Sequence, residues 1–107
     1  MAEAASAPPV LDGYFSFDEV DRPAKPLGDW LVHPETLPRL SSVRAEIWVW
    51  ISATGQIDRW ELAPDAQPRD LLMRALSEFD LTQLRPAMRN NLAVPNFRRI
   101  EIVISRD

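Results

Sequence analysis

The chain has 107 residues, which is enough for one small domain, because two cores of half that size would bury too little apolar surface. It contains no cysteine, which excludes disulfides and thiolate metal sites, and no apolar run long enough for a transmembrane helix. The net charge of −4 disfavours binding to nucleic acids, although residues 82–107 carry five basic and two acidic side chains.

We expect residues 1–11 to be a flexible tail and residues 12–29 to be an extended leader that packs on the domain of residues 30–107. The tail is rich in alanine and has no apolar period, whereas the leader combines aromatic residues with spaced prolines that favour extended backbone. Pro34 suits the first position of a helix, because its missing N–H would have no partner there, so His33–Leu37 predicts one or two helical turns.

The clearest strand is Val43–Ser52, where apolar and other residues alternate along the backbone. The aliphatic face would hold Val43, Ala45, Ile47, Val49 and Ile51, and the opposite face Arg44, Glu46, Trp48 and Trp50. Gly55 tolerates a positive φ, and apolar residues resume at Ile57, so a hairpin is expected. The uneven step from Ile57 to Trp60 suggests a bulge in the returning strand.

A helix is expected from Pro68 to about Phe79, because apolar residues recur there at helical spacing. The pair Asn90-Asn91 tolerates left-handed backbone, and Asn96–Ser105 then alternates as a third strand. These elements predict an α+β fold: a two-layer sandwich in which a three-stranded antiparallel sheet has two helices on one face.

Short motifs in this order resemble the C-terminal domain of TonB-family energy transducers from about Tyr14 to Ser105. The motifs are the hairpin Ala45–Asp58, Leu84-Arg85-Pro86-Ala87, Asn90-Asn91, Val94-Pro95, and the leader segments Asp18–Pro23 and Pro26–Gly28. The sequence departs from the family pattern at Leu84, where an aromatic residue is usual, at Asn91 and Ser42, where glycine is common, and at His33-Pro34, where Tyr-Pro is usual.

The resemblance implies a periplasmic domain that is tethered to the inner membrane in the full-length form. Such domains bind the TonB box, a short N-terminal segment of outer-membrane transporters, by strand addition, and so couple the proton-motive force to active transport. Inner-membrane motor proteins would be reached only through segments outside this sequence. The resemblance implies no cofactor and no nucleic acid, and a monomer or a weak homodimer.

The last strand would lie at an edge of the sheet, if the first hairpin strand is central, and its free backbone groups could accept a guest strand. The expected peptide-binding residues are Asn96, Phe97, Arg98, Arg99, Ile100, Glu101, Ile102 and Val103, with Trp30 and Val32 carried over from the family as a secondary site. Arg98 and Arg99 could pair with an acidic residue of the guest, or could be solvated charges that block aggregation of the edge.

Trp48 and Trp50 stand on a face that would otherwise meet water, so something is expected to cover them. The candidates are the leader aromatics Tyr14, Phe15 and Phe17, or stacking by Arg59 and Arg99. The alternatives are a homodimer or partner surface, or a nucleic-acid platform with Arg44, which Glu46, Glu61 and Glu101 on the same face would oppose.

We expect no enzyme, because the sequence has no nucleophile and base motif and no phosphate-binding glycine loop. The single histidine, His33, has no evident partner in the sequence. It could not hold a metal ion without a cysteine or a second histidine.

Overall fold

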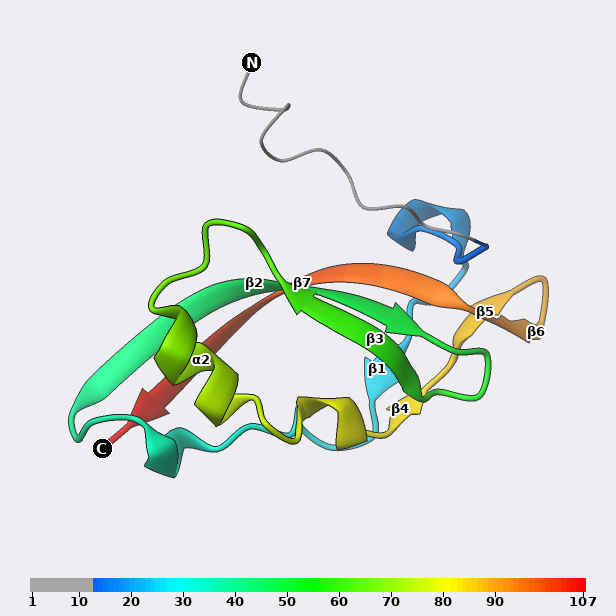
Figure 1. The fold of residues 1–107 in the computed structure, drawn as a ribbon. Coiled ribbons are helices and arrows are strands. Elements are labelled where there is room, and N and C mark those ends of the chain that lie inside the picture. Colours follow the sequence, from blue (N-terminus) through cyan, green and yellow to red (C-terminus); the bar gives the residue numbers. More distant parts are fainter. Residues whose placement is uncertain (1–12) are drawn as a thin grey trace, which may run out of the picture.

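A three-stranded antiparallel sheet is the centre of the computed structural model, which describes residues 13–107 (Figure 1). Its strands are β2 (Ser41–Ile51), β3 (Ile57–Leu62) and β7 (Asn96–Arg106), in the order β3-β2-β7. The prediction of three strands with the first hairpin strand in the middle is confirmed, and both long strands lie within two residues of their predicted bounds.

The two faces of the sheet differ in chemistry, as the alternation predicted. In β2 the residues Ala45, Ile47, Val49 and Ile51 are buried in the main core, together with Ile100, Ile102 and Ile104 of β7. The other face holds a second, smaller cluster of Trp48, Trp50, Ala63 and Phe97. Both faces of β2 are therefore covered over part of its length.

The β2–β3 hairpin has the bulge that the spacing of apolar residues predicted. Trp50 pairs with Arg59 but Ile51 pairs with Ile57, so Asp58 is the extra residue. The turn requires glycine at position 55, since φ is +85° there and an added Cβ would lie 1.9 Å from the carbonyl oxygen of Leu84. This close approach allows the Leu84 N–H to donate to the Gly55 carbonyl at 2.9 Å.

Among residues 13–107 there is one α-helix, α2 (Arg69–Ala75), and it is shorter than the predicted helix. The backbone leaves the helical region at Leu76, and the chain turns into a 3-10 helix, η3 (Phe79–Leu81). This turn brings the Phe79 ring into the core, where it stacks on Trp30 at 5.2 Å and meets the edge of Trp60 at 5.4 Å. Tertiary packing of the aromatic ring therefore overrides the helical period of the sequence.

The second predicted helix is one 3-10 turn, η2 (Pro34–Thr36). It ends the segment of residues 30–36 that follows the leader, which we call the connector. Figure 1 shows α2, η2 and the connector on the same side of the sheet, and their buried residues Leu37, Leu72, Ala75 and Leu76 complete the main core. The fold is thus a small α+β domain in which α2 and η2 lie on one face of the sheet.

The sequence did not predict two further small sheets, of which the first joins the leader to the segment after η3 and the second is a short hairpin that the leader meets through an Arg22–Met88 bridge. They pair β1 (Lys25–Pro26) with β4 (Leu84–Arg85), and β5 (Ala87–Arg89) with β6 (Leu92–Val94). Asn90 and Asn91, between β5 and β6, have positive φ values of 53° and 65°, as their residue type predicted.

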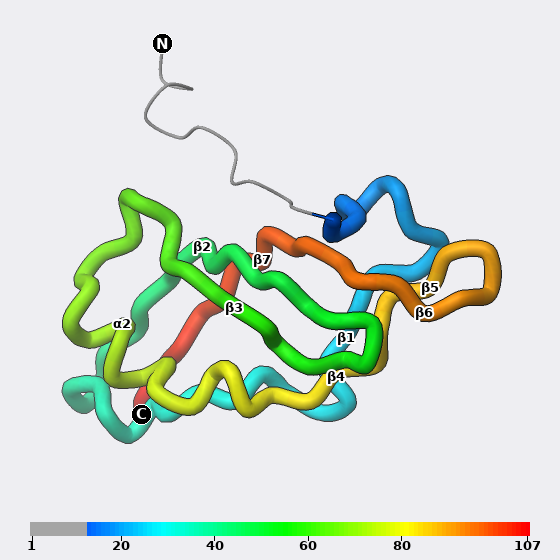
Figure 2. The backbone as a smooth tube through the Cα atoms, turned by 45° about the vertical axis from the view of Figure 1, so that its right-hand side comes forward, coloured from blue at the N-terminus to red at the C-terminus, as the bar shows by residue number. Residues whose placement is uncertain are grey.

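The leader contains one 3-10 turn, η1 (Phe17–Glu19), and packs on the domain beside the start of β7 (Figure 2). Asp21 and Arg22 donate their backbone N–H groups to the Met88 carbonyl at 2.8 and 3.2 Å. The predicted tail at residues 1–11 lies outside the described residues.

Candidate functional site

The outer side of β7 is defined by the hydrogen bonding of Phe97. Its N–H donates to the Phe15 carbonyl at 2.8 Å, on the side away from β2. Because successive residues of an antiparallel ladder direct their backbone groups to opposite sides, the groups of every second residue after Phe97 also face outward. These residues are Arg99, Glu101, Val103 and Ser105.

The start of this edge is occupied by the protein's own leader, which differs from the prediction that the edge is free from Asn96 onward. Besides the Phe97 bond, the Phe15 N–H donates to the Pro95 carbonyl at 3.0 Å. The buried Asn96 side chain accepts from the Ala24 N–H at 3.0 Å and donates to the Phe15 carbonyl at 2.9 Å. Asn96 and Phe97 therefore hold the leader and are not available to a guest strand while it stays in place.

From Arg99 to Ser105 the outward backbone groups have no backbone partner among residues 13–107. The far end is closed by Arg106, whose Nη1 donates to the carbonyls of Glu35 and Leu37 at 3.0 and 2.7 Å. We call the backbone between these two boundaries the free edge. It has room for a guest strand of about seven residues.

Side chains of the free edge divide between the two faces of the sheet. Ile100 and Ile102 are buried in the core, so a guest strand could contact only the sides of these residues that face the edge. Arg99 and Glu101 are exposed on the opposite face, and Val103 has 51% of its surface exposed. The face with the tryptophans therefore presents mixed charges and one valine beside the free edge.

Arg98 and Arg99, which the sequence treats alike, have different surroundings. The Arg99 guanidinium lies 5.9 Å from the centre of the Trp48 ring and is exposed. Arg98 is on the core-facing side, where its Nη1 donates to the Ala24 carbonyl at 2.7 Å. Burial lowers the pKa of Arg98 from its usual value.

Trp30 and Val32 belong to the layer beneath the sheet. Trp30 stacks on Phe79, and both residues pack against the main core. No hydrogen bond or ring contact within residues 13–107 joins either of them to β7. Their contacts are those of an anchor for the connector, which does not support their expected role as a secondary peptide site.

Trp48 and Trp50 are covered, with only 8% and 2% of their surfaces exposed. Tyr14 of the leader packs against the cluster that they form with Ala63 and Phe97, and the Arg59 guanidinium lies 3.9 Å from the centre of the Trp50 ring. Both predicted kinds of cover are therefore present. The Trp48 indole N–H also donates to the Glu46 carboxylate at 2.7 Å.

The other leader aromatics do not contribute to this cover as expected. The Phe15 ring lies under the Arg89 guanidinium, 4.6 Å from ring centre to Cζ, and Phe17 is largely exposed. Phe15 bridges Asn96 in extended backbone, where neighbouring side chains point to opposite faces, so its ring diverges from that of Tyr14, and Phe17 belongs to the η1 turn.

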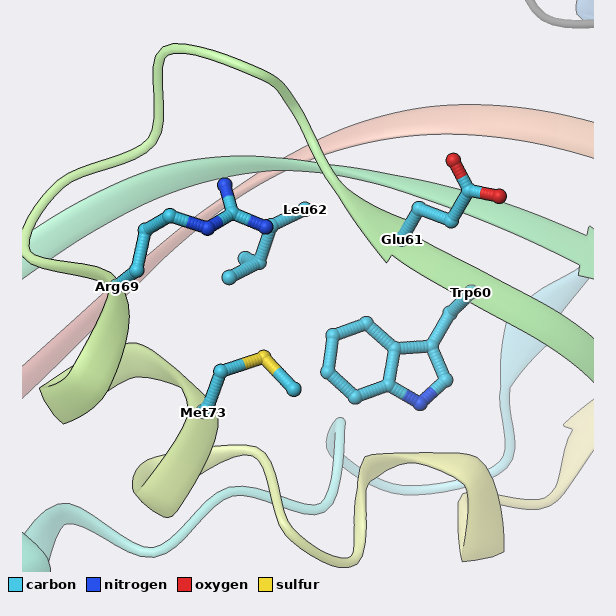
Figure 3. Close-up of a pocket in the computed structure, with 5 residues that line it drawn as sticks. All are labelled: Trp60, Glu61, Leu62, Arg69 and Met73. Carbon is cyan, nitrogen blue, oxygen red and sulfur yellow. The ribbon is translucent and has the colours of Figure 1, made fainter.

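The outer side of β3, away from β2, has a pocket beside it that the sequence did not predict. The pocket has a volume of about 350 Å³. Figure 3 shows Trp60, Leu62, Arg69 and Met73 around it, whereas the Glu61 carboxylate points away. Met73 has 50% of its surface exposed and does not lie on the buried face of α2, which is formed by Leu72 and Ala75. An apolar residue off the apolar face of a helix is the signal in the sequence that could have indicated this pocket.

His33 has two carboxylate partners that are not evident in the sequence, since Glu78 is distant from it along the chain. Its Nδ1 lies 2.9 Å from Glu35 and its Nε2 lies 2.7 Å from Glu78. The hydrogen bond to Glu78, and to a smaller extent that to Glu35, raises the pKa of His33. The pair with Glu78 joins the connector to the chain that follows α2.

No family model matches the sequence, and no curated protein is similar enough to count as a relative. Among residues 13–107, no group of three or more histidine or acidic side chains is arranged to hold a metal ion. Within the same part of the chain, no helix combines the length and the apolar character needed to cross a bilayer.

Proposed function

We propose that this domain binds an extended peptide by strand addition along the free edge of β7, as the C-terminal domain of a TonB-like energy transducer does. The guest would be the TonB box of an outer-membrane transporter, and the domain would act in the periplasm, linked to the inner membrane by other segments. The observation that carries the proposal is the outer side of β7 from Arg99 to Ser105, which has no backbone partner among residues 13–107.

The leader supports this proposal, because it already uses the same side of β7 in the way a guest would. Phe15 lies parallel to Asn96 and exchanges two backbone hydrogen bonds with Pro95 and Phe97. The edge is therefore straight enough and exposed enough to accept backbone partners at its start. The sheet order β3-β2-β7, with helical elements on one face, is also the arrangement that the resemblance implies.

The expected affinity is modest. Each added backbone bond contributes only about 1 kcal/mol net, and ordering the peptide opposes binding, so Kd should lie roughly in the micromolar to millimolar range. The first test is a titration of the labelled domain with peptides from transporter N-termini, followed by amide chemical shifts. We expect the largest changes at residues 99–105, and changes confined to residues 58–62 would place the guest on the wrong edge.

A proline substitution tests whether the backbone of the free edge is what binds. Val103→Pro removes an outward N–H without touching the ladder to β2, so the domain should stay folded while peptide affinity falls by about fivefold or more. Ile102→Pro is the matched control, because the Ile102 N–H faces β2 and its loss should lower stability. Unchanged peptide affinity in folded Val103→Pro would contradict the proposal.

A nucleic-acid platform is less well supported, because the two tryptophan rings that would stack on bases are buried. A homodimer through the same edge is the closer competitor. Sedimentation at several concentrations distinguishes a homodimer from a peptide-binding monomer, since the mass of the monomer does not change with concentration.

A further inference from the structure

The pocket between β3 and α2 presents an apolar surface to solvent. It is lined by Trp60, Leu62, Arg69 and Met73, and we call the space between these residues the β3 groove. Its volume of about 350 Å³ falls in the range of ligand pockets, roughly 300–1,000 Å³. Met73 has 50% of its surface exposed, and its side chain points toward the Trp60 ring (Figure 3). An apolar side chain of a ligand would therefore find two apolar partners here.

The backbone of β3 beside this groove has unused hydrogen-bonding groups. The Ala63 N–H donates to the Glu46 carbonyl at 3.0 Å, so the backbone groups of Ala63 face β2. Because the direction alternates along an antiparallel ladder, the groups of Trp60 and Leu62 face outward. None of these outward groups has a backbone partner among residues 13–107. An edge of this kind accepts another extended chain through backbone hydrogen bonds.

A cation at one end of the β3 groove has no acidic partner in the described part of the chain. The Arg69 guanidinium is exposed and donates from Nη1 to the Ala63 carbonyl at 3.3 Å. No ion pair within residues 13–107 includes it. The Glu61 carboxylate points away from the pocket and pairs with Arg59 at 3.4 Å (Figure 3). A guanidinium has five N–H donors, so Arg69 retains donors for a carboxylate.

We infer that the β3 groove binds a second extended peptide, whose apolar side chain fills the pocket and whose acidic side chain, two positions away, pairs with Arg69. A guest residue opposite Trp60 would direct its side chain to the same face as the indole, beside Met73. A guest residue opposite Leu62 would lie beside Arg69, because side chains two residues apart share one face of a strand. The ligand is therefore an extended segment in which one residue separates an apolar from an acidic side chain.

The β3 groove is separate from the free edge of β7. The two strands lie on opposite sides of β2, so a short guest in the groove leaves the free edge accessible. The domain can then hold two extended partners at once. Binding in the groove goes beyond the function proposed for β7 and does not depend on it, so either can fail without the other.

The test uses capped six-residue peptides that carry Leu and Glu two positions apart in a background of threonine. Both orders of Leu and Glu are used, because a guest can run in either direction along β3. We expect the preferred order to shift the amide signals of Trp60, Leu62 and Met73. Replacing Leu by Ala in the peptide should weaken binding about tenfold, because less apolar surface is buried. Replacing Glu by Gln should weaken it about two- to fivefold, since an exposed ion pair contributes little.

Variants of α2 assign each part of the ligand to its partner. Met73→Glu puts a charge into the pocket at an exposed position and should weaken binding at least tenfold, whereas Met73→Leu should change it less than about twofold. In Arg69→Met the ratio between the Glu and Gln peptides should fall to near one. Arg74→Met is the matched control, because Arg74 is also an exposed arginine of α2 but does not line the pocket, and the ratio should persist.

Four results would overturn this assignment. They are shifts only at residues 99–105, unchanged affinity in Met73→Glu, a Glu preference that survives Arg69→Met, and no shift at residues 60–73 with either order at millimolar peptide. A mass that rises with domain concentration, and does not rise in Met73→Glu, would also overturn it, because a second copy of the chain would then fill the groove. Transporter peptides that fail to shift residues 99–105 would overturn only the function proposed for β7.

Discussion

Gly55→Ala should be more damaging than the same substitution at either of the other two glycines of the chain. The residue has φ +85°, and the new Cβ would lie 1.9 Å from the Leu84 carbonyl oxygen. A left-handed non-glycine residue costs about 1–2 kcal/mol, and moving the two segments apart would lose the Leu84 to Gly55 hydrogen bond, worth about 1 kcal/mol. The expected loss in the free energy of unfolding is about 2–3 kcal/mol.

The other two glycines separate the causes of this loss. Gly13 has φ +91° but open space around its Cβ position, and Gly28 has open space without a positive φ. Gly13→Ala should therefore cost at most about 1–2 kcal/mol from backbone strain alone. Gly28→Ala should be neutral, or stabilising by up to about 1 kcal/mol, because alanine restricts the unfolded chain.

Urea unfolding followed by tryptophan fluorescence measures all three variants on one scale. The order of stability should be Gly28→Ala, then Gly13→Ala, then Gly55→Ala, with similar slopes in urea. If Gly55→Ala unfolds at the same urea concentration as Gly13→Ala, the close approach to Leu84 contributes nothing and the reasoning is refuted.

Three further substitutions test the leader and the connector. Asn96→Ala should lower stability by about 1–3 kcal/mol in urea unfolding, since it leaves the buried Ala24 N–H without an acceptor. The pKa of His33 is raised in the folded state, chiefly by Glu78, so its stabilising effect is full below its unfolded value of 6.5 and is lost as pH rises through the higher folded value. The stability difference between the unmodified domain and His33→Gln should accordingly shrink as pH rises from about 6 to about 8. Tyr14→Ala should shift tryptophan emission to longer wavelength, because it uncovers part of the indole cluster on the outer face.

Each of these expectations has an outcome that contradicts it. Wild-type stability in Asn96→Ala would mean that another group satisfies the freed N–H. A His33→Gln difference that grows with pH would have the wrong sign for a raised pKa. An unchanged emission spectrum in Tyr14→Ala would show that the leader does not shield the indoles.

The three main strands could be predicted from the sequence because their signal is local. Alternation along β2 and β7 reports directly which side chains meet the core, and the hairpin turn and its bulge follow from Gly55 and the spacing after it. The end of α2 could not be predicted, because Phe79 continues the helical period while its ring is buried by Trp30 and Trp60, which come from distant parts of the chain.

The candidate site could also be predicted from the sequence only in part. Its location on the last strand follows from the strand order, whereas its length depends on contacts between residues more than sixty positions apart, such as Phe15 with Phe97 and Arg106 with Leu37. Such contacts have no local signature. The pocket beside β3 was missed for the same reason, since it exists only where α2 meets Trp60.

By itself, the sequence determined which strands form and which of their faces are apolar, because the two-residue period of a strand is a property of neighbouring residues. Only the tertiary structure decided how much of the β7 edge is free, which arginine has a guanidinium nitrogen buried without a hydrogen-bond partner within residues 13–107, and where the leader ends its contact with the sheet. These features depend on which segments share water-excluded space after folding: Arg98 lies beside Ala24 of the leader, whereas Arg99 is exposed near Trp48.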